Sequence, residues 1–278
     1  MTLRSSAMSP RWRWSPAGLV AGERMLAAET AVALAYDGAA HAVMMATPDD
    51  LEDFATGFSL SEGLADSPDD IIDLEIAVGD LGVELRMRLA ERCGSRHAAR
   101  RRHMAGPVGC GLCGVQSLAE AVRPAATVTG RARIPADALM AAMASLPHGQ
   151  RLNQEVRAVH AAAFWRPADG IVALREDVGR HNALDKLAGA LARRRVAGDG
   201  GAVLLSSRVS VEMVQKAARL GAPVLVAVSA PTELAVRTAE GCGITLVGVA
   251  RGDGFEVFSH PERIVASPAV PRLALGAL

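Results

Sequence analysis

The stretch AVLLSSRVSVEMVQKAARLGAPVLVAVSAPTELAVRTAEGCGITLVGVA, residues 202–250, contains three short apolar segments at equal spacing. AVLLSS begins at Ala202, PVLVAVS at Pro223 and ITLVGVA at Ile244. The intervening SVEMVQKAARLG and PTELAVRTAEGCG are typical of helices, and each ends in glycine, which commonly stops a helix. Apolar strands that alternate with helices predict a parallel sheet with helices on both faces.

The sequence before this stretch alternates between strand and helix patterns. Residues 24–45 are typical of two strands with a turn at Asp37–Gly38, and residues 71–89 are typical of two more. Thr47 is predicted to cap an intervening helix, and Asn182 to cap a later one.

The chain divides by composition into three parts. Residues 1–20 contain arginines and serines without an apolar core, and we expect a disordered tail there. Residues 21–125 are predicted to form an N-terminal α+β region that ends in a mobile loop rich in arginine and glycine. Residues 126–278 are predicted to form a C-terminal α/β domain that binds a nucleotide or cofactor.

Composition also limits the class of protein. Half of the 278 residues are hydrophobic, so the chain can bury a full core. Thirty acidic residues balance thirty basic residues, which does not favour a non-specific nucleic-acid binder. Four cysteines are too few for a disulfide scaffold, and no apolar run approaches a membrane span. We therefore expect a soluble, cytoplasmic protein with reduced thiols.

Polar side chains follow two of the predicted strands. Ser206, Ser207 and Arg208 come directly after the first strand, and Ser229 and Thr232 follow the second. Ligands of open α/β sheets bind outside the carboxyl ends of the strands, where helix N-termini present free N–H groups. These residues predict a cradle for a phosphate or nucleotide, although serine and threonine also cap ordinary helices at such positions.

The segment REDVGRHNALDK, residues 175–186, concentrates charge at a strand-to-helix junction. Arg180 could bind an anion there, and His181 could transfer a proton near neutral pH. The alternative is ordinary charge at a helix start, with His181 bonded to backbone. The density of charged residues favours a binding role.

Two cysteines, Cys110 and Cys113, lie in the glycine-rich segment GPVGCGLCG. Flanking glycines weaken the hypothesis of a rigid redox couple, and a structural zinc site needs two further ligands. A deaminase-type catalytic zinc site needs an H-x-E triplet earlier in the chain, whereas the one triplet present begins at His260. A reactive thiolate on a flexible loop fits best, because a following helix would lower the thiol pKa.

Several segments together resemble the formate dehydrogenase accessory sulfurtransferases, the FdhD family. The matching segments are TPDDLEDFATGFSLSEGL, CGLCGV, EDVGRHNALDK, SSRVSVEMVQKAARLGAPVLVAVSAPT and GVARGDGFEVFSHPERI. They span most of the chain from about Leu34 onward. The pair EDVGRHNALDK and SSRVSVEMVQKA is highly specific for this family.

The resemblance implies a sulfur carrier. Such a protein accepts persulfide sulfur from a cysteine desulfurase and transfers it to the bis-molybdopterin guanine dinucleotide molybdenum cofactor, which formate dehydrogenase requires. The family's persulfide-bearing cysteine matches Cys110, and Cys113 is expected to assist, accept or resolve the persulfide. Guanine nucleotides such as GDP are expected to mimic the cofactor. A non-catalytic cofactor-binding chaperone and a thiol oxidoreductase are the alternatives.

The resemblance also implies a fold and a binding site. The expected fold is a cytidine-deaminase-like three-layer α/β/α core with a mixed sheet, plus a smaller N-terminal β-rich subdomain. No metal ligands are expected, and the chain is expected to form a homodimer. The residues predicted to bind the cofactor, from the strand-end argument and from the family's C-terminal stretch, are Arg180, His181, Ser206, Ser207, Arg208, Ser229, Thr232, Val249, Ala250, Arg251, Gly252, Asp253, Gly254 and Phe255.

Overall fold

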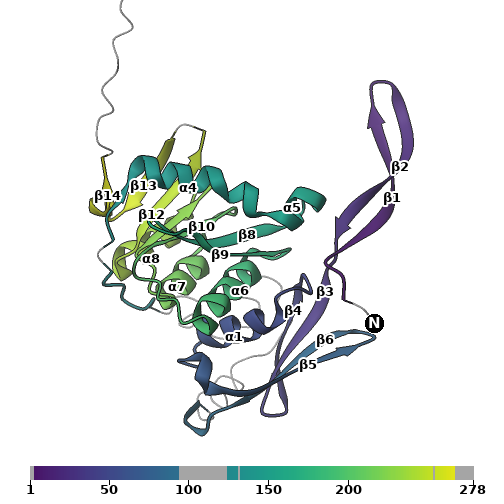
Figure 1. Cartoon of the computed structure of the whole chain (residues 1–278), viewed down its shortest axis with the longest axis horizontal. Helices are drawn as coiled ribbons and strands as arrows, with labels where there is room; N and C mark the ends of the chain where they lie inside the picture. Colours follow the sequence, from purple (N-terminus) through teal and green to yellow (C-terminus); the bar gives the residue numbers. More distant parts are fainter. Residues whose placement is uncertain (1–2, 94–123, 131, 253, 267–278) are drawn as a thin grey trace, which may run out of the picture.

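Two sheets, each with its own hydrophobic core, and a projecting ribbon organise the molecule (Figure 1). The structure is a computed structural model that describes residues 3–93, 124–130, 132–252 and 254–266. The part built on the six-stranded sheet is called the large unit, and the part built on the four-stranded sheet the small unit. Among the described residues, no helix has the length and apolar character that crossing a membrane requires.

The sheet of the large unit has the strand order β13-β12-β11-β10-β8-β9. Its strands are β8 (His160–Arg166), β9 (Gly170–Asp177), β10 (Ala202–Leu205), β11 (Val224–Ala227), β12 (Thr245–Arg251) and β13 (Gly254–Ser259). The three central strands β10, β11 and β12 run parallel, which confirms the prediction from their spacing. The flanking strands β8, β9 and β13 are antiparallel to their neighbours, so the sheet is mixed.

Helices cover both faces of this sheet. Helices α6 (Arg180–Arg193), α7 (Val211–Arg219) and α8 (Glu233–Cys242) lie on one face, and α4 (Ala136–Gly149), followed by α5 (Arg151–Val156), lies on the other (Figure 1). Strand β10 shows why, because its side chains alternate: Val203 and Leu205 join the core under α6 and α7, whereas Ala202 and Leu204 join the core under α4. A strand that is apolar on both faces must be covered on both.

The small unit is a four-stranded sheet packed on one helix. Strands β3 (Thr30–Tyr36), β4 (Ala39–Ala46), β5 (Ile71–Gly79) and β6 (Gly82–Leu89) have the order β4-β3-β6-β5, and helix α1 (Leu51–Ser61) covers one face. Both predicted strand pairs are confirmed. The predicted cap at Thr47 is wrong, because the helix begins after Asp50, which has a left-handed backbone. A short 3-10 helix (Pro68–Asp70) precedes β5.

Helices α1 and α6 join the two units through a close crossing at glycines. A Cβ atom on Gly57 of α1 would overlap the carbonyl oxygen of Asp185, and one on Gly189 of α6 would overlap that of Asp53. Each glycine therefore lets its helix approach the backbone of the other helix. This crossing places the small unit against the α6 side of the large unit (Figure 1).

The N-terminal residues form a ribbon that projects from the body of the molecule (Figure 1). Strands β1 (Ser6–Ser15) and β2 (Gly18–Ala27) pair antiparallel over their full length, and Gly18 takes a positive φ of 114° at the turn. The disordered tail predicted for residues 1–20 is therefore wrong for the strand residues. That prediction rested on composition, and composition alone does not indicate that two adjacent segments pair across a turn.

Short elements complete the described chain. Strands β7 (Ile134–Pro135) and β14 (Ile264–Val265) pair in parallel, and a 3-10 helix (Pro261–Arg263) precedes β14. The predicted boundary between residues 125 and 126 stays a prediction, because residues 94–123 lie outside the described residues.

Candidate functional site

The ends of five strands meet at one edge of the large sheet. The backbone N–H of Ser206, after β10, donates to the carbonyl of Ala161 in β8 at 3.1 Å. Val209 forms a parallel bridge with Pro231, which follows β11. The N–H of Val249 in β12 donates to the carbonyl of Ser229 at 3.3 Å. Strand β9 reaches the same edge, because its last residue pairs with the first residue of β8. The predicted strand-end residues are therefore brought together.

The strand-end hydroxyl groups mostly hold the loops in place. The Oγ of Ser206 accepts a hydrogen bond from the N–H of Ala161 at 2.8 Å, and the hydroxyl of Ser207 donates to the carbonyl of Arg208 at 3.0 Å. Thr232 caps α8 by accepting from the N–H of Ala235 at 3.3 Å. The capping alternative is thus confirmed for Thr232, whereas Ser206 and Ser207 bond backbone groups of β8 and of their own loop.

Positive charge gathers at this edge around His160, the first residue of β8. Burial lowers the pKa of His160, and the nearby charges of Arg180 and Arg208 lower it further, while Asp177 acts in the opposite direction. Arg208 is exposed, so its guanidinium is accessible to solvent beside the strand ends. Two arginines and the N-termini of α6 and α7 make this edge suitable for an anion.

Four buried polar atoms at the edge have no hydrogen-bond partner among the described residues. They are Arg180 Nε, His181 Nε2, Ser210 Oγ and Glu212 Oε2. His181 Nε2 lies 4.0 Å from Glu212 Oε2, and His181 is only 8% exposed. Buried polar groups are nearly always hydrogen-bonded in native proteins. These four atoms can therefore form hydrogen bonds with a polar ligand.

His181 is neutral in this environment. Burial lowers the pKa of His181 to about 4, with further lowering by the charges of Arg180 and Lys216 and partial opposition from Glu212 and Glu62. A neutral imidazole beside a carboxylate offers acceptor atoms to a ligand that carries N–H groups. Ser210 and Glu212 were missed by the sequence argument, which stopped at Arg208 instead of following the same strand end into the first turn of α7.

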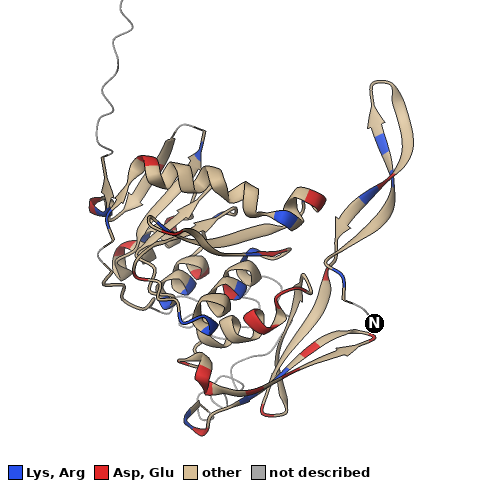
Figure 2. Cartoon of the chain, in the orientation of Figure 1, with Lys and Arg blue, Asp and Glu red and all other residues tan. Residues whose placement is uncertain are grey.

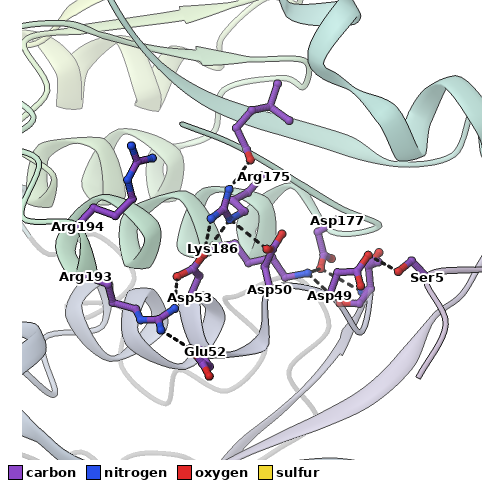
Figure 3. A network of polar contacts seen from close by, with 12 residues as sticks. Ser5, Asp49, Asp50, Glu52, Asp53, Arg175, Asp177, Lys186, Arg193 and Arg194 are labelled. Carbon is purple, nitrogen blue, oxygen red and sulfur yellow. Dashed lines mark hydrogen bonds and ion pairs between the residues drawn. The ribbon is translucent and has the colours of Figure 1, made fainter. Parts of the chain in front are cut away.

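Most charged residues of the segment 175–186 have structural roles (Figure 3). Asp177 forms a fully buried ion pair with Lys186 at 2.7 Å, and its carboxylate also accepts from the N–H groups of Thr47 and Gly179 and the side-chain amide of Asn182. The predicted cap at Asn182 is wrong, because the residue before the first helical residue of α6 is Gly179. Asp177 instead fixes the backbone that carries Arg180 and His181.

A second buried ion pair involves Asp185, the residue directly before Lys186 in α6. Lys216 Nζ lies 2.7 Å from Asp185 Oδ1, and both groups bond the hydroxyl of Ser61 in the small unit. Lys186 and Lys216 are the two lysines of the whole sequence, and both are buried against a carboxylate. Both ion pairs lie within the large unit, and each lysine also donates to a residue of the small unit, Lys186 to the carbonyl of Thr47 and Lys216 to the hydroxyl of Ser61.

The run from Val249 to Phe255 lies at the end of β12. Val249 has a positive φ of 54°, a strained conformation for a β-branched residue, and Gly252 has a positive φ of 68°. Ala250, Arg251 and Gly252 line a cavity of about 440 Å³ together with methionine and alanine side chains of α4. Asp253, which was also predicted to bind the cofactor, lies outside the described residues.

The cysteines divide into two groups. Cys110 and Cys113 lie outside the described residues. Cys93 and Cys242 are buried free thiols, and burial raises the pKa of Cys242, which makes it a poor nucleophile. Within the described ranges, histidine, cysteine and carboxylate side chains form no group of three or more that could hold a metal ion.

Comparisons with known proteins agree with one another. A family model described as the FdhD/NarQ family matches residues 27–265. A protein named sulfur carrier protein FdhD from Agrobacterium fabrum is 49% identical over 88% of this chain and 90% of its own length. A protein of the same name from Cupriavidus necator is 50% identical over 91% of this chain and 88% of its own length.

A solved structure shares the fold over nearly the whole chain. The crystal structure of a putative formate dehydrogenase accessory protein from Desulfotalea psychrophila matches with a TM-score of 0.74 and 26% sequence identity. The match covers 94% of this chain and 100% of that chain. Together with the family model and the similar sequences, this shows that the chain belongs to the FdhD/NarQ family.

Proposed function

We propose that the chain is a sulfur carrier in the maturation of formate dehydrogenase. It accepts persulfide sulfur from a cysteine desulfurase on Cys110 and transfers this sulfur to the bis-molybdopterin guanine dinucleotide molybdenum cofactor. The observation that carries the proposal is the polar edge of the large sheet, where buried polar atoms that have no hydrogen-bond partner in the described part of the chain adjoin two arginines. The names of the similar proteins support the sulfur-carrier part of the proposal.

The chemistry of the edge fits the nucleotide ends of that cofactor. Arg180 and Arg208, with the N-termini of α6 and α7, suit a diphosphate. The carboxylate of Glu212 suits the paired N–H donors of a guanine base, and its Oε2 is buried without a partner among the described residues. Neutral His181 can bond a nucleotide without adding positive charge to the site.

One turnover of sulfur transfer through the two cysteines balances with the electrons of their own thiols, and a dithiol reductant must then reduce the resulting disulfide before the next turnover. The Cys110 thiolate attacks the outer sulfur of the desulfurase persulfide, a new S–S bond forms, and the desulfurase leaves as a thiolate. Attack by the Cys113 thiol on the inner sulfur then releases hydrogen sulfide for the cofactor and leaves a Cys110–Cys113 disulfide. The two thiols supply the two electrons that reduce the outer sulfur, so Cys113 has a defined role.

The remaining expectations belong to the same proposal. The mixed sheet with helices on both faces supports a cytidine-deaminase-like core, in which this edge corresponds to the ligand-binding side. Cytoplasmic location and formate dehydrogenase as the recipient remain parts of the proposal. A non-catalytic chaperone would use the same edge and would carry no persulfide on Cys110.

GDP binding tests the nucleotide part of the proposal. GDP is expected to raise the melting temperature of the protein, because a ligand that binds only the folded state stabilises it. Arg208→Ala should abolish most of this shift, and Arg237→Ala, which removes an exposed arginine of α8, should preserve it. An unchanged melting temperature of the unmodified protein at saturating GDP would refute the nucleotide site.

A second variant tests the proposed guanine contact. Glu212→Gln should weaken GDP binding by about 10- to 100-fold, because a charged hydrogen-bond acceptor contributes roughly 1.5–3 kcal/mol. Inosine diphosphate, which lacks the exocyclic amine, should lose less affinity in this variant than GDP does. Glu233→Gln, on the exposed first turn of α8, is the matched control. Equal loss for both nucleotides would show that Glu212 does not accept from the exocyclic amine of guanine.

A further inference from the structure

His160 is a residue of the strand-end edge to which the proposed function gives no role. Strand β8 begins at His160, and successive side chains of a strand point to opposite faces of the sheet. Ala162 and Phe164 belong to the core under α6 and α7, so His160 lies on that same face. It is half-buried there. Its imidazole therefore lies on the side of the edge where α6 and α7 begin.

The neighbouring elements bring two arginines to this histidine. Strand β9 places Asp177 opposite His160, and Arg180 begins α6 three residues later. The loop after β10, which is hydrogen-bonded to the start of β8, carries Arg208. The positive charges of Arg180 and Arg208 both act on the imidazole of His160, and the negative charge of Asp177 acts in the opposite direction.

The carboxylate of Asp177 has its own partners. One oxygen accepts from the N–H of Thr47 and pairs with Lys186 (Figure 3). The other oxygen accepts from the N–H of Gly179 and the side-chain amide of Asn182. Its negative charge therefore balances the buried lysine, and the positive charge of the two arginines is left in excess at the edge.

The buried or half-buried cations deeper in the two helices are already paired. Figure 2 shows both basic and acidic positions on α6 and α7. Lys186, Arg193 and Lys216 each form an ion pair with a carboxylate. Arg180 differs, because its Nε is buried without a hydrogen-bond partner among the described residues. Arg208 is exposed beside it on the same edge, so the two guanidinium groups are suited to hold an anion together.

An anion between the arginines changes the protonation of the histidine beside them. Burial lowers the pKa of His160 below the ordinary value of 6.5, and the charges of Arg180 and Arg208 lower it further, so the ring is neutral without a ligand. The negative charge of a diphosphate offsets the arginines and favours the imidazolium form. A protonated ring then donates a charge-assisted hydrogen bond to a phosphate oxygen.

We propose that His160 is a third residue that binds the diphosphate, beside Arg180 and Arg208, and that it takes up one proton from solvent as the diphosphate binds. This inference rests on the proposed function and adds a residue and a proton to its nucleotide site. The complex then binds more protons than the separate protein and ligand do. By linkage, the affinity for the diphosphate rises as the pH falls.

GDP-mannose is the probe that tests this proton. Its diphosphate is esterified at both ends, as in a guanine dinucleotide, whereas the terminal phosphate of GDP has a pKa near 6 and would contribute a proton of its own. Isothermal titration calorimetry at about pH 6.5, in two buffers with different ionisation enthalpies, should show uptake of about 0.5 proton or more per GDP-mannose bound. The dissociation constant should fall by about 5- to 10-fold from about pH 7.5 to about pH 6.0.

Three variants assign the proton to one histidine. His160→Gln should abolish the proton uptake and flatten the pH dependence, and it should still bind GDP-mannose through the two arginines. His181→Gln should weaken binding and keep the proton uptake, because His181 lies beside Glu212 and is assigned to the base. His148→Gln, which replaces an exposed histidine in the last turn of α4, is the matched control and should keep both the affinity and the uptake.

Circular dichroism and the melting temperature establish that each variant is folded, and NMR of the unmodified protein reads the ring directly. The imidazole signals of His160, identified by their loss in His160→Gln, should report a neutral ring at about pH 6.5 and a protonated ring after GDP-mannose is added. Binding without proton uptake, or with the same uptake in His160→Gln, would overturn this inference alone. No binding of GDP-mannose to the unmodified protein would overturn both the inference and the dinucleotide site on which it rests.

Discussion

His181 couples the candidate site to the stability of the protein. Its pKa is lowered to about 4 in the folded protein, mainly by burial, whereas an unfolded chain has an ordinary histidine near 6.5. The unfolded state therefore binds a proton first as the pH falls. The neutral buried histidine is compatible with the fold above pH 6.5, and stability is lost between pH 6.5 and 4.

Replacing His181 should remove its contribution to the pH dependence of stability. Chemical denaturation of the unmodified protein should show a free energy of unfolding that falls by up to about 3 kcal/mol over that pH window because of His181. His181→Gln should flatten this fall, and the residual slope should reflect His160, whose pKa burial also lowers. An identical pH dependence for the variant and the unmodified protein would contradict a neutral His181.

The Asp185–Lys216 pair is buried within the large unit, and Lys216 also contacts Ser61 and Glu62 of the small unit. Lys216→Met leaves the carboxylate of Asp185 buried without its cation, and the free energy of unfolding should fall by about 3–5 kcal/mol. Asp185→Asn/Lys216→Met removes both charges and should recover a large part of that loss. Urea denaturation of the unmodified protein, Asp185→Asn, Lys216→Met and the double variant measures this coupling, and additive losses in the double variant would show that the groups act independently.

Helices α1 and α6 owe their close crossing to two glycines. Gly57→Ala places a methyl group on the carbonyl of Asp185, and the free energy of unfolding should fall by about 3 kcal/mol or more. Gly241→Ala in α8 has open space around its Cβ and should stabilise the protein by up to about 1 kcal/mol. Thermal denaturation distinguishes these effects, and a neutral Gly57→Ala would show that the crossing can relax.

Strand periodicity predicted the regular elements well and missed those that depend on distant contacts. Strands β10 to β12 are apolar on both faces, so their local pattern suffices to identify them. Thr47 illustrates the opposite case. Its hydroxyl accepts from the N–H of Val178 in the large unit and its own N–H donates to Asp177, so the residue links two units instead of capping α1. No local pattern contains that partner.

The arrangement of strands and helices in the whole molecule determines which site residues could be predicted from the sequence. Parallel strands place their carboxyl ends at one edge, so Arg180, His181 and Arg208 could be grouped from the sequence. The role of Glu212 could not be predicted, because the burial of its Oε2 without a hydrogen-bond partner among the described residues depends on how α7 packs beside α6. The family resemblance, from motifs in both units, was confirmed by the match over residues 27–265. It is also the source of the role proposed for Cys110, which lies outside the described residues.

The central claim is that this chain carries sulfur, and mass spectrometry of the intact protein tests it most directly. After incubation with a cysteine desulfurase and cysteine, the account predicts a mass increase of one sulfur atom that a reducing agent removes. Cys110→Ala should abolish the increase, and Cys242→Ala, which removes a buried thiol, should leave it unchanged. No added sulfur on the unmodified protein, or the same increase in Cys110→Ala, would contradict the account.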